Sequence, residues 1–143
     1  MNIFLKLSVI ILIIFLNSCS KKEEKISMIQ EKELRLQMID AYKEGVKALE
    51  EGDVLFAAKK FNEAEILFPQ SEWASKSILM AAYSYYTQDY YYDTISELDR
   101  FIKNYPKDER LNYAHFLLAM CYYEQVVDEK KDLGPLLNAQ KEF

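Results

Sequence analysis

Two prolines, Pro69 and Pro106, end two segments of similar pattern and stand 37 residues apart. Before each proline come a long helical pattern, a short break at Gly52 or at Asp89, and a second helical pattern. A proline cannot continue an established helix, and it biases the residue before it away from the helical conformation. A repeat of this length is typical of a solenoid, in which small units stack because one unit cannot bury its own apolar face.

The composition agrees with helices, because only three glycines and three prolines interrupt 143 residues and a turn-rich β fold would need more. The last helical pattern stops without a closing proline, and we therefore expect a truncated version of a longer chain. Ser71 and Asp108 are the expected caps of the third and fifth helices. The pattern predicts six helices, at about residues 33–51, 54–67, 72–88, 90–104, 109–127 and 134–143.

The small and aromatic residues of these units resemble the tetratricopeptide repeat. The first unit carries that signature in Gly45, Ala57, Phe61, Ala64 and Pro69. The second keeps Ala82, Tyr85 and Pro106, and departs from it at Thr94, Leu98 and Phe101. The resemblance implies an all-α, right-handed solenoid of three helix pairs, the last one incomplete. It would form one domain over residues 33–143, with repeats at about 38–70, 75–107 and 112–143.

The first residues follow a different pattern. Lys6 precedes the apolar run Leu7 to Leu16, which is well short of the roughly 20 residues that a membrane-spanning helix needs. A short basic segment, an apolar run of this length and small polar residues are typical of a secretory signal. We therefore expect residues 1–18 to be a signal peptide.

The segment "LNSC", which ends at Cys19, resembles a bacterial lipobox. This resemblance implies cleavage before Cys19, an S-diacylglycerol and an N-acyl chain on that cysteine, and export to the outer membrane because Ser20 follows. Several acyl chains would anchor the chain stably. The alternative is an ordinary signal or anchor with a coincidental cysteine. Residues 19–32 are mostly charged and polar, and we expect a flexible tether there.

Most chemical functions find no support in the sequence. The formal charge of −5 does not favour nucleic-acid binding, which needs a basic face. The single histidine, His115, has no cysteine or carboxylate at helical spacing, so we expect neither a metal site nor another cofactor. No nucleophile and base are paired, and the sequence predicts no enzyme. Cys121 lies in an apolar stretch and is expected to be a buried side chain.

Tyrosine is unusually abundant, with eleven in all and six in "YSYYTQDYYYD". In tetratricopeptide proteins the first helix of each pair lines the concave face, which here would form an amphipathic groove for an extended peptide or a helix. The expected groove residues are Tyr42, Leu79, Tyr83, Tyr86, Tyr113, Phe116 and Tyr123. The alternative is that such tyrosines fill the core, and Tyr85 and Tyr122 are assigned to the core.

The segments "ELDRFIKNYP" and "CYYEQ" resemble the BamD family of lipoproteins. This resemblance implies a non-enzymatic, lipid-anchored scaffold of the outer-membrane β-barrel assembly complex, on the periplasmic face of the outer membrane. Its implied partners are BamA, the other lipoproteins of the complex, and unfolded outer-membrane protein precursors. The groove would take the carboxy-terminal signal of a precursor, which tends to end in an aromatic residue. The alternative function is a periplasmic tetratricopeptide adaptor for cell-wall synthesis or division.

Overall fold

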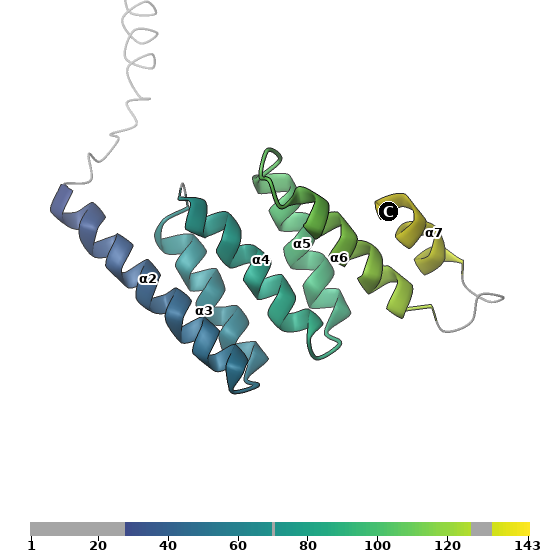
Figure 1. Cartoon of the computed structure of the whole chain (residues 1–143), viewed down its shortest axis with the longest axis horizontal. Coiled ribbons are helices and arrows are strands. Elements are labelled where there is room, and N and C mark those ends of the chain that lie inside the picture. Colours follow the sequence, from purple (N-terminus) through teal and green to yellow (C-terminus); the bar gives the residue numbers. More distant parts are fainter. Residues whose placement is uncertain (1–27, 70, 127–132) are drawn as a thin grey trace, which may run out of the picture.

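The structure, a computed structural model, describes residues 28–69, 71–126 and 133–143 (Figure 1). The described residues form helices and no strand, as the all-α prediction requires. In chain order the helices are α2 (Met28–Glu50), α3 (Val54–Leu67), α4 (Glu72–Tyr86), α5 (Tyr91–Asn104), α6 (Leu111–Glu124) and α7 (Gly134–Glu142).

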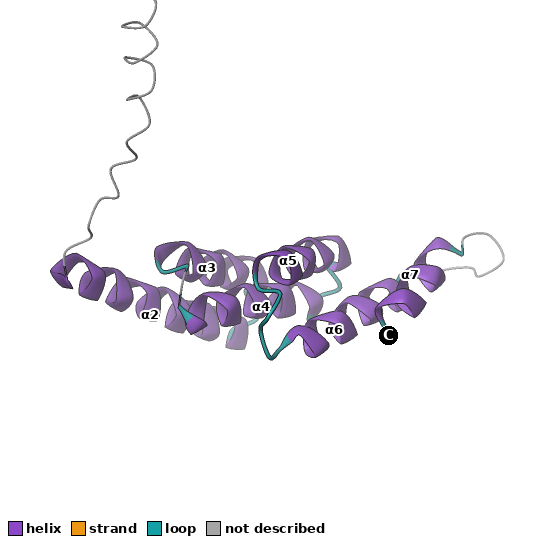
Figure 2. Ribbon diagram, turned by 90° about the horizontal axis from the view of Figure 1, so that it is seen from above, coloured by secondary structure: helices purple, strands orange, loops and turns teal. Residues whose placement is uncertain are grey.

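The helices follow one another along the long axis of the molecule, and each packs mainly on its neighbours in sequence (Figure 1). Figure 2 shows that α2, α4 and α6 lie in one layer, with α3 and α5 above them. The pairs are therefore α2–α3, α4–α5 and α6–α7, and the predicted solenoid of stacked helix pairs is confirmed. The last pair is the least complete, because α7 has nine residues where α3 and α5 each have 14.

The first pair is held by a close approach of α2 to α3. A Cβ atom added to Gly45 would lie 2.9 Å from two ring carbons of Phe61. Phe61 is fully buried, and its ring meets that of Tyr42 edge to face at a centroid distance of 5.2 Å. Glycine is therefore favoured at position 45 for a steric reason, because any side chain there would displace the buried ring of Phe61.

The second core joins α4, α5 and α6 and contains residues that depart from the repeat signature. Leu98 and Phe101 are fully buried in it, and the buried Thr94 hydroxyl donates to the carbonyl of Tyr90 at 3.0 Å. These residues thus fill the core between the helices with side chains of a different shape from those of the repeat signature. Cys121 is buried in the same core, as predicted, and burial raises the pKa of its thiol to about 12, so the thiol stays protonated.

A polar cluster ties α3 to α5 between the first two pairs. Arg100 forms ion pairs with Glu97 and with the buried Glu65, and it donates to the side-chain oxygen of Asn62 at 2.7 Å. The Tyr105 hydroxyl also donates to Glu65, at 3.2 Å. Burial, followed by this neighbouring carboxylate, raises the pKa of Tyr105 to about 12. The polar side chains of this cluster therefore have partners, and the cluster fixes how the second pair sits on the first.

The starts of α4 and α6 test the two predicted helix caps. Ser71 caps α4, because its side chain accepts a hydrogen bond from the backbone N–H of Ala74 at 3.2 Å. The predicted cap at Asp108 is wrong, because α6 begins at Leu111. The Asp108 carboxylate instead accepts from the backbone and side chain of Arg110.

The predicted tether, residues 19–32, needs a correction at its end, because α2 already begins at Met28. Glu31 lies in the first turn, where the helix dipole favours a negative charge, and it pairs with Arg35 at 3.7 Å. These local interactions extend the helix into a segment whose polarity alone suggested a tether. The predicted signal peptide and Cys19 lie outside the described residues. No helix in the described part of the chain is long and apolar enough to cross a bilayer.

Candidate functional site

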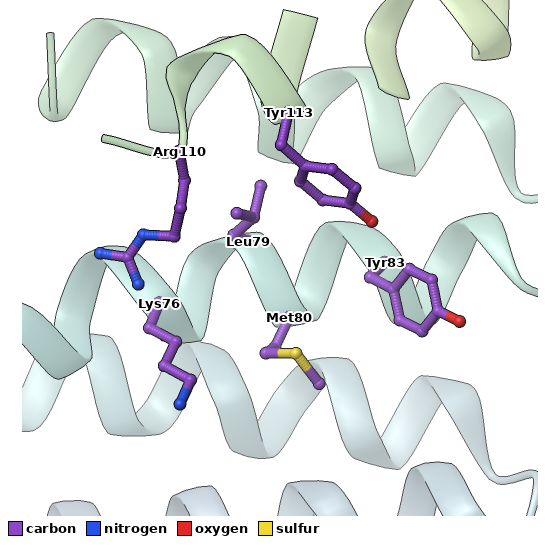
Figure 3. Close-up of a pocket in the computed structure, with 6 residues that line it drawn as sticks. All are labelled: Lys76, Leu79, Met80, Tyr83, Arg110 and Tyr113. Atoms are coloured by element: carbon purple, nitrogen blue, oxygen red, sulfur yellow. The ribbon is translucent and has the colours of Figure 1, made fainter. Parts of the chain in front are cut away.

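The layer of α2, α4 and α6 carries an open hollow of about 480 Å³ between α4 and α6 (Figure 3). Helix α4 supplies most of its lining, and the start of α6 supplies the rest. The lining residues are Lys76, Leu79, Met80, Tyr83, Arg110 and Tyr113. Most of this surface is apolar, with the two cationic side chains at one end of the hollow and the two tyrosines toward the other (Figure 3).

A second hollow, of about 290 Å³, lies between α2 and α4. It is lined by Ile39, Tyr42, Lys43, Val46, Trp73 and Lys76. Lys76 lines both hollows, so the two adjoin across α4. We call the two hollows together the groove.

Lys76 stands where the two hollows meet, and its ammonium lies over aromatic rings. Its Nζ atom is 4.9 Å from the ring centroid of Trp73 and 5.5 Å from that of Tyr42. Among the described residues no carboxylate pairs with it. A cation–π contact attracts an ammonium without neutralising its charge. The groove therefore holds a positive charge within an acidic protein.

Arg110 is held in a fixed position at the edge of the first hollow. Its guanidinium donates to both oxygens of Asp108, each at 2.7 Å, and to the hydroxyl of Ser75 at 2.8 Å. These charge-assisted bonds hold the pKa of Asp108 well below its usual range. The Asp108 carboxylate largely balances the charge of Arg110, which leaves Lys76 as the less compensated of these two cations.

This ion pair predicts how stability depends on pH. A carboxyl with a lowered pKa in the folded protein adds stability above its unfolded pKa of about 3.9, and this stability is lost as the pH falls toward the folded value. We expect Asp108→Asn to lower the free energy of unfolding at pH 7 by about 2 kcal/mol. We also expect the free energy of unfolding of this variant to depend less steeply on pH below pH 4 than that of the wild type.

Urea denaturation at a series of pH values measures both effects. Asp40→Asn is a matched control, because Asp40 is an exposed aspartate of α2. It should follow the wild-type curve. Parallel curves for wild type and Asp108→Asn below pH 4 would contradict the assigned role of the pair.

The structure places the seven predicted groove residues in different environments. Four side chains are open to solvent, with exposed fractions between 39% and 56%: Tyr83, Tyr113, Phe116 and Tyr123. Tyr42 and Tyr86 are half-buried. Leu79 is buried, although it lines the first hollow.

The groove brings together four of these seven residues. Leu79, Tyr83 and Tyr113 line the first hollow, and Tyr42 lines the second. The other three line neither hollow; Tyr86 packs against Tyr91, and Phe116 packs against Phe143. The two tyrosines assigned to the core, Tyr85 and Tyr122, are half-buried and pack against the two main core clusters.

Sequence reasoning missed the cations of the groove. Lys76 precedes Leu79 by three residues and Tyr83 by seven, a spacing that puts all three side chains on one face of the helix. This spacing could have identified Lys76 as a groove residue. Arg110 gave no such signal, because it lies just outside the helix and reaches the hollow only through the turn before α6.

The described residues contain no cluster of three or more side chains that could hold a metal ion. His115 contacts Glu142, with 2.7 Å between Nδ1 and Oε2, and so links α6 to α7. This contact joins two helices of the last pair and lies outside the groove.

An all-α stack of helix pairs with an open groove along one layer defines a tetratricopeptide-like repeat protein. Residues 35–143 match the family model described as "YfiO: Outer membrane lipoprotein", and the chain belongs to this family. The comparison agrees with the resemblance carried by the segments at residues 97–106 and 121–125.

Two curated relatives are both described as "Outer membrane protein assembly factor BamD". The protein of Caulobacter vibrioides (strain ATCC 19089 / CIP 103742 / CB 15) is 37% identical over 114 residues, which cover 80% of this chain and 36% of the relative. The protein of Rickettsia prowazekii (strain Madrid E) is 30% identical over 91 residues, which cover 64% of this chain and 36% of the relative. The chain thus matches about a third of the length of each relative.

Proposed function

We propose that this protein is a lipid-anchored scaffold in the assembly of outer-membrane β-barrel proteins. The family description and the name shared by both relatives support this role. In the proposal, S-diacylglycerol and N-acyl chains on Cys19 hold the protein at the outer membrane, with the solenoid on the periplasmic side. BamA and the other lipoproteins of the assembly complex are the proposed partners, as the sequence resemblance implies.

The groove is the proposed binding site for unfolded β-barrel precursors. The observation that carries this assignment is Lys76, an ammonium without a carboxylate partner among the described residues, in a hollow that also exposes Tyr83 and Tyr113. A precursor that ends in an aromatic residue carries an aromatic ring and a terminal carboxylate side by side. The ring would lie against the tyrosines, and the carboxylate would pair with Lys76.

The hollow suits weak, reversible binding. It is open, so a bound peptide end would keep part of its surface in water, and much of its affinity would come from one apolar contact and one charge-assisted hydrogen bond. A scaffold that must release its substrate to an insertion machine needs such binding. The proposal includes no catalytic step.

A matched pair of peptides tests this assignment. We expect a fluorescent peptide ending in phenylalanine to bind the full chain about tenfold more tightly as the free acid than as the carboxy-terminal amide, because the amide cannot form the ion pair. Lys76→Met keeps the apolar stem of the side chain and should remove this difference. Lys103→Met, at an exposed lysine of α5, is the control and should keep it.

The same measurement, made by fluorescence anisotropy, contains the results that would contradict the proposal. Equal binding of acid and amide by the wild type would overturn the role of Lys76. Equal binding of a scrambled peptide without a terminal aromatic residue would overturn precursor recognition and favour the cell-wall adaptor.

A further inference from the structure

Helix α2 extends beyond the rest of the solenoid. It has 23 residues, whereas its partner α3 has 14, and its first buried residue is Met38. Figure 1 shows the amino-terminal end of α2 projecting past the neighbouring helices. The first ten residues of α2, residues 28–37, therefore form an overhang that the core does not require.

The overhang exposes large apolar side chains on one side. Met28, Ile29 and Leu36 are 87%, 81% and 54% exposed, and the exposed Lys32 lies between them on the same face. At 3.6 residues per turn this face is roughly opposite to the one that carries the buried residues of α2. We call these four side chains the α2 stripe. Water-exposed apolar groups gathered on one face indicate an interaction surface.

The chain before the overhang indicates what the stripe meets. Nine residues of chain lead from Cys19 to Met28, and even fully extended they would span no more than about 30 Å. Acyl chains on Cys19 would therefore keep the stripe within that distance of a bilayer and give it a high effective concentration at the surface. The same short segment carries three lysines and two glutamates, so its formal charge of +1 attracts anionic headgroups only weakly.

We propose that the α2 stripe docks on the phospholipid surface of the membrane that holds the acyl chains. This inference rests on the proposed acylation of Cys19. The three apolar side chains would enter the boundary between headgroups and acyl chains, while Lys32 would extend its ammonium to a lipid phosphate. Helix α2 would lie on the surface, since no helix of the described residues can span a bilayer.

Docking would give the solenoid a defined orientation. The stripe faces away from α3, so α2 would lie between the bilayer and the rest of the first helix pair. A lipid anchor alone would hold only one point of the molecule at the surface, whereas the lipid anchor and the stripe together hold two.

Fluorescence quenching by lipid tests the proposal on the full acylated chain, purified from bacterial envelopes and reconstituted into vesicles of phosphatidylethanolamine and phosphatidylglycerol with brominated acyl chains. Met28→Trp places a reporter in the stripe. Ile66→Trp is the matched control, because Ile66 is an exposed apolar residue of α3 outside the stripe. The signal of the single native tryptophan, Trp73, is measured in the wild type and subtracted.

We expect the reporter at position 28 to be quenched at least about threefold more than the reporter at position 66, because only the first enters the bilayer. Adding Ile29→Asp and Leu36→Asp to Met28→Trp should abolish this difference without unfolding the chain, since both side chains are exposed. Equal quenching at positions 28 and 66 would overturn the docking.

A mass measurement of the purified chain separates this inference from the proposed function. An acylated chain with an unquenched reporter contradicts the docking and leaves the lipid anchor intact. A chain without acyl groups would remove the anchor and the docking together, and peptide binding to the groove is measured independently of both.

Discussion

Replacing Phe61 with alanine is expected to lower the free energy of unfolding by about 3–5 kcal/mol. The ring is fully buried and fills the space that Gly45 leaves open between α2 and α3. Removing it leaves a cavity that the neighbouring backbones can close only in part. A small domain has a total stability of about 5–15 kcal/mol, so the loss is a large share of it.

Urea denaturation followed by far-ultraviolet circular dichroism measures this effect. Phe56→Ala is the matched control, because Phe56 is a phenylalanine of the same helix that is partly open to solvent. It should cost less than about 1 kcal/mol. If the two variants were equally stable, the close approach of α2 and α3 would not be the main support of the first pair.

Phe61 also links the core to the groove. Its ring contacts Tyr42, and the ring of Tyr42 in turn meets that of Trp73 edge to face at 5.1 Å. The rings of Tyr42 and Trp73 both lie beneath the ammonium of Lys76. We therefore expect Phe61→Ala to weaken binding of a free-acid peptide as well, through the position of Lys76.

The second large effect is expected in the groove itself, from the double substitution Tyr83→Ala and Tyr113→Ala. The two rings line one hollow from different helices, and both are partly open to solvent. Truncating an aromatic side chain in a binding surface often costs about 1 kcal/mol or more, so the two truncations together should cost about 2 kcal/mol, and the double variant should bind the terminal-phenylalanine peptide about 30-fold more weakly. Its far-ultraviolet circular dichroism and urea midpoint should change little.

Tyr92→Ala is the control, because Tyr92 is an exposed tyrosine of α5, outside the groove. The double variant Tyr83→Phe and Tyr113→Phe separates the rings from their hydroxyls and should keep most of the affinity if ring contact dominates. Loss of helicity in the alanine pair would place the two rings in the core. Unchanged peptide affinity would move the binding site away from this hollow.

The helices themselves could be predicted well from the sequence. The range expected for α3, residues 54–67, is the one observed, because Asp53 and the proline at 69 mark both of its ends locally. The ends of α2 and α6 were displaced by a few residues. There the outcome depends on which partner each polar side chain finds, as when Arg110 engages Asp108 and leaves α6 to begin later.

The groove could be predicted only in outline. Tyr83 and Tyr86 are three residues apart on one helix, and both were expected to line the groove. Tyr83 is exposed in the first hollow, whereas Tyr86 is half-buried against Tyr91 of the next helix. Helical spacing gives the face on which a side chain lies, but the neighbouring helix decides how much of that face stays open.

The sequence alone determined the repeat, because the prolines, the small residues and the apolar period act within one helix or between adjacent helices and can be recognised locally. It also carried the family resemblance, and it remains the basis for the predicted acylation of Cys19. The tertiary structure decided that Lys76 lies over the ring of Tyr42 and shares a hollow with Tyr113, since these three residues belong to three different helices. Their meeting depends on how one helix pair stacks on the next, and that geometry is set by packing summed over many side chains, which no short segment of the chain encodes.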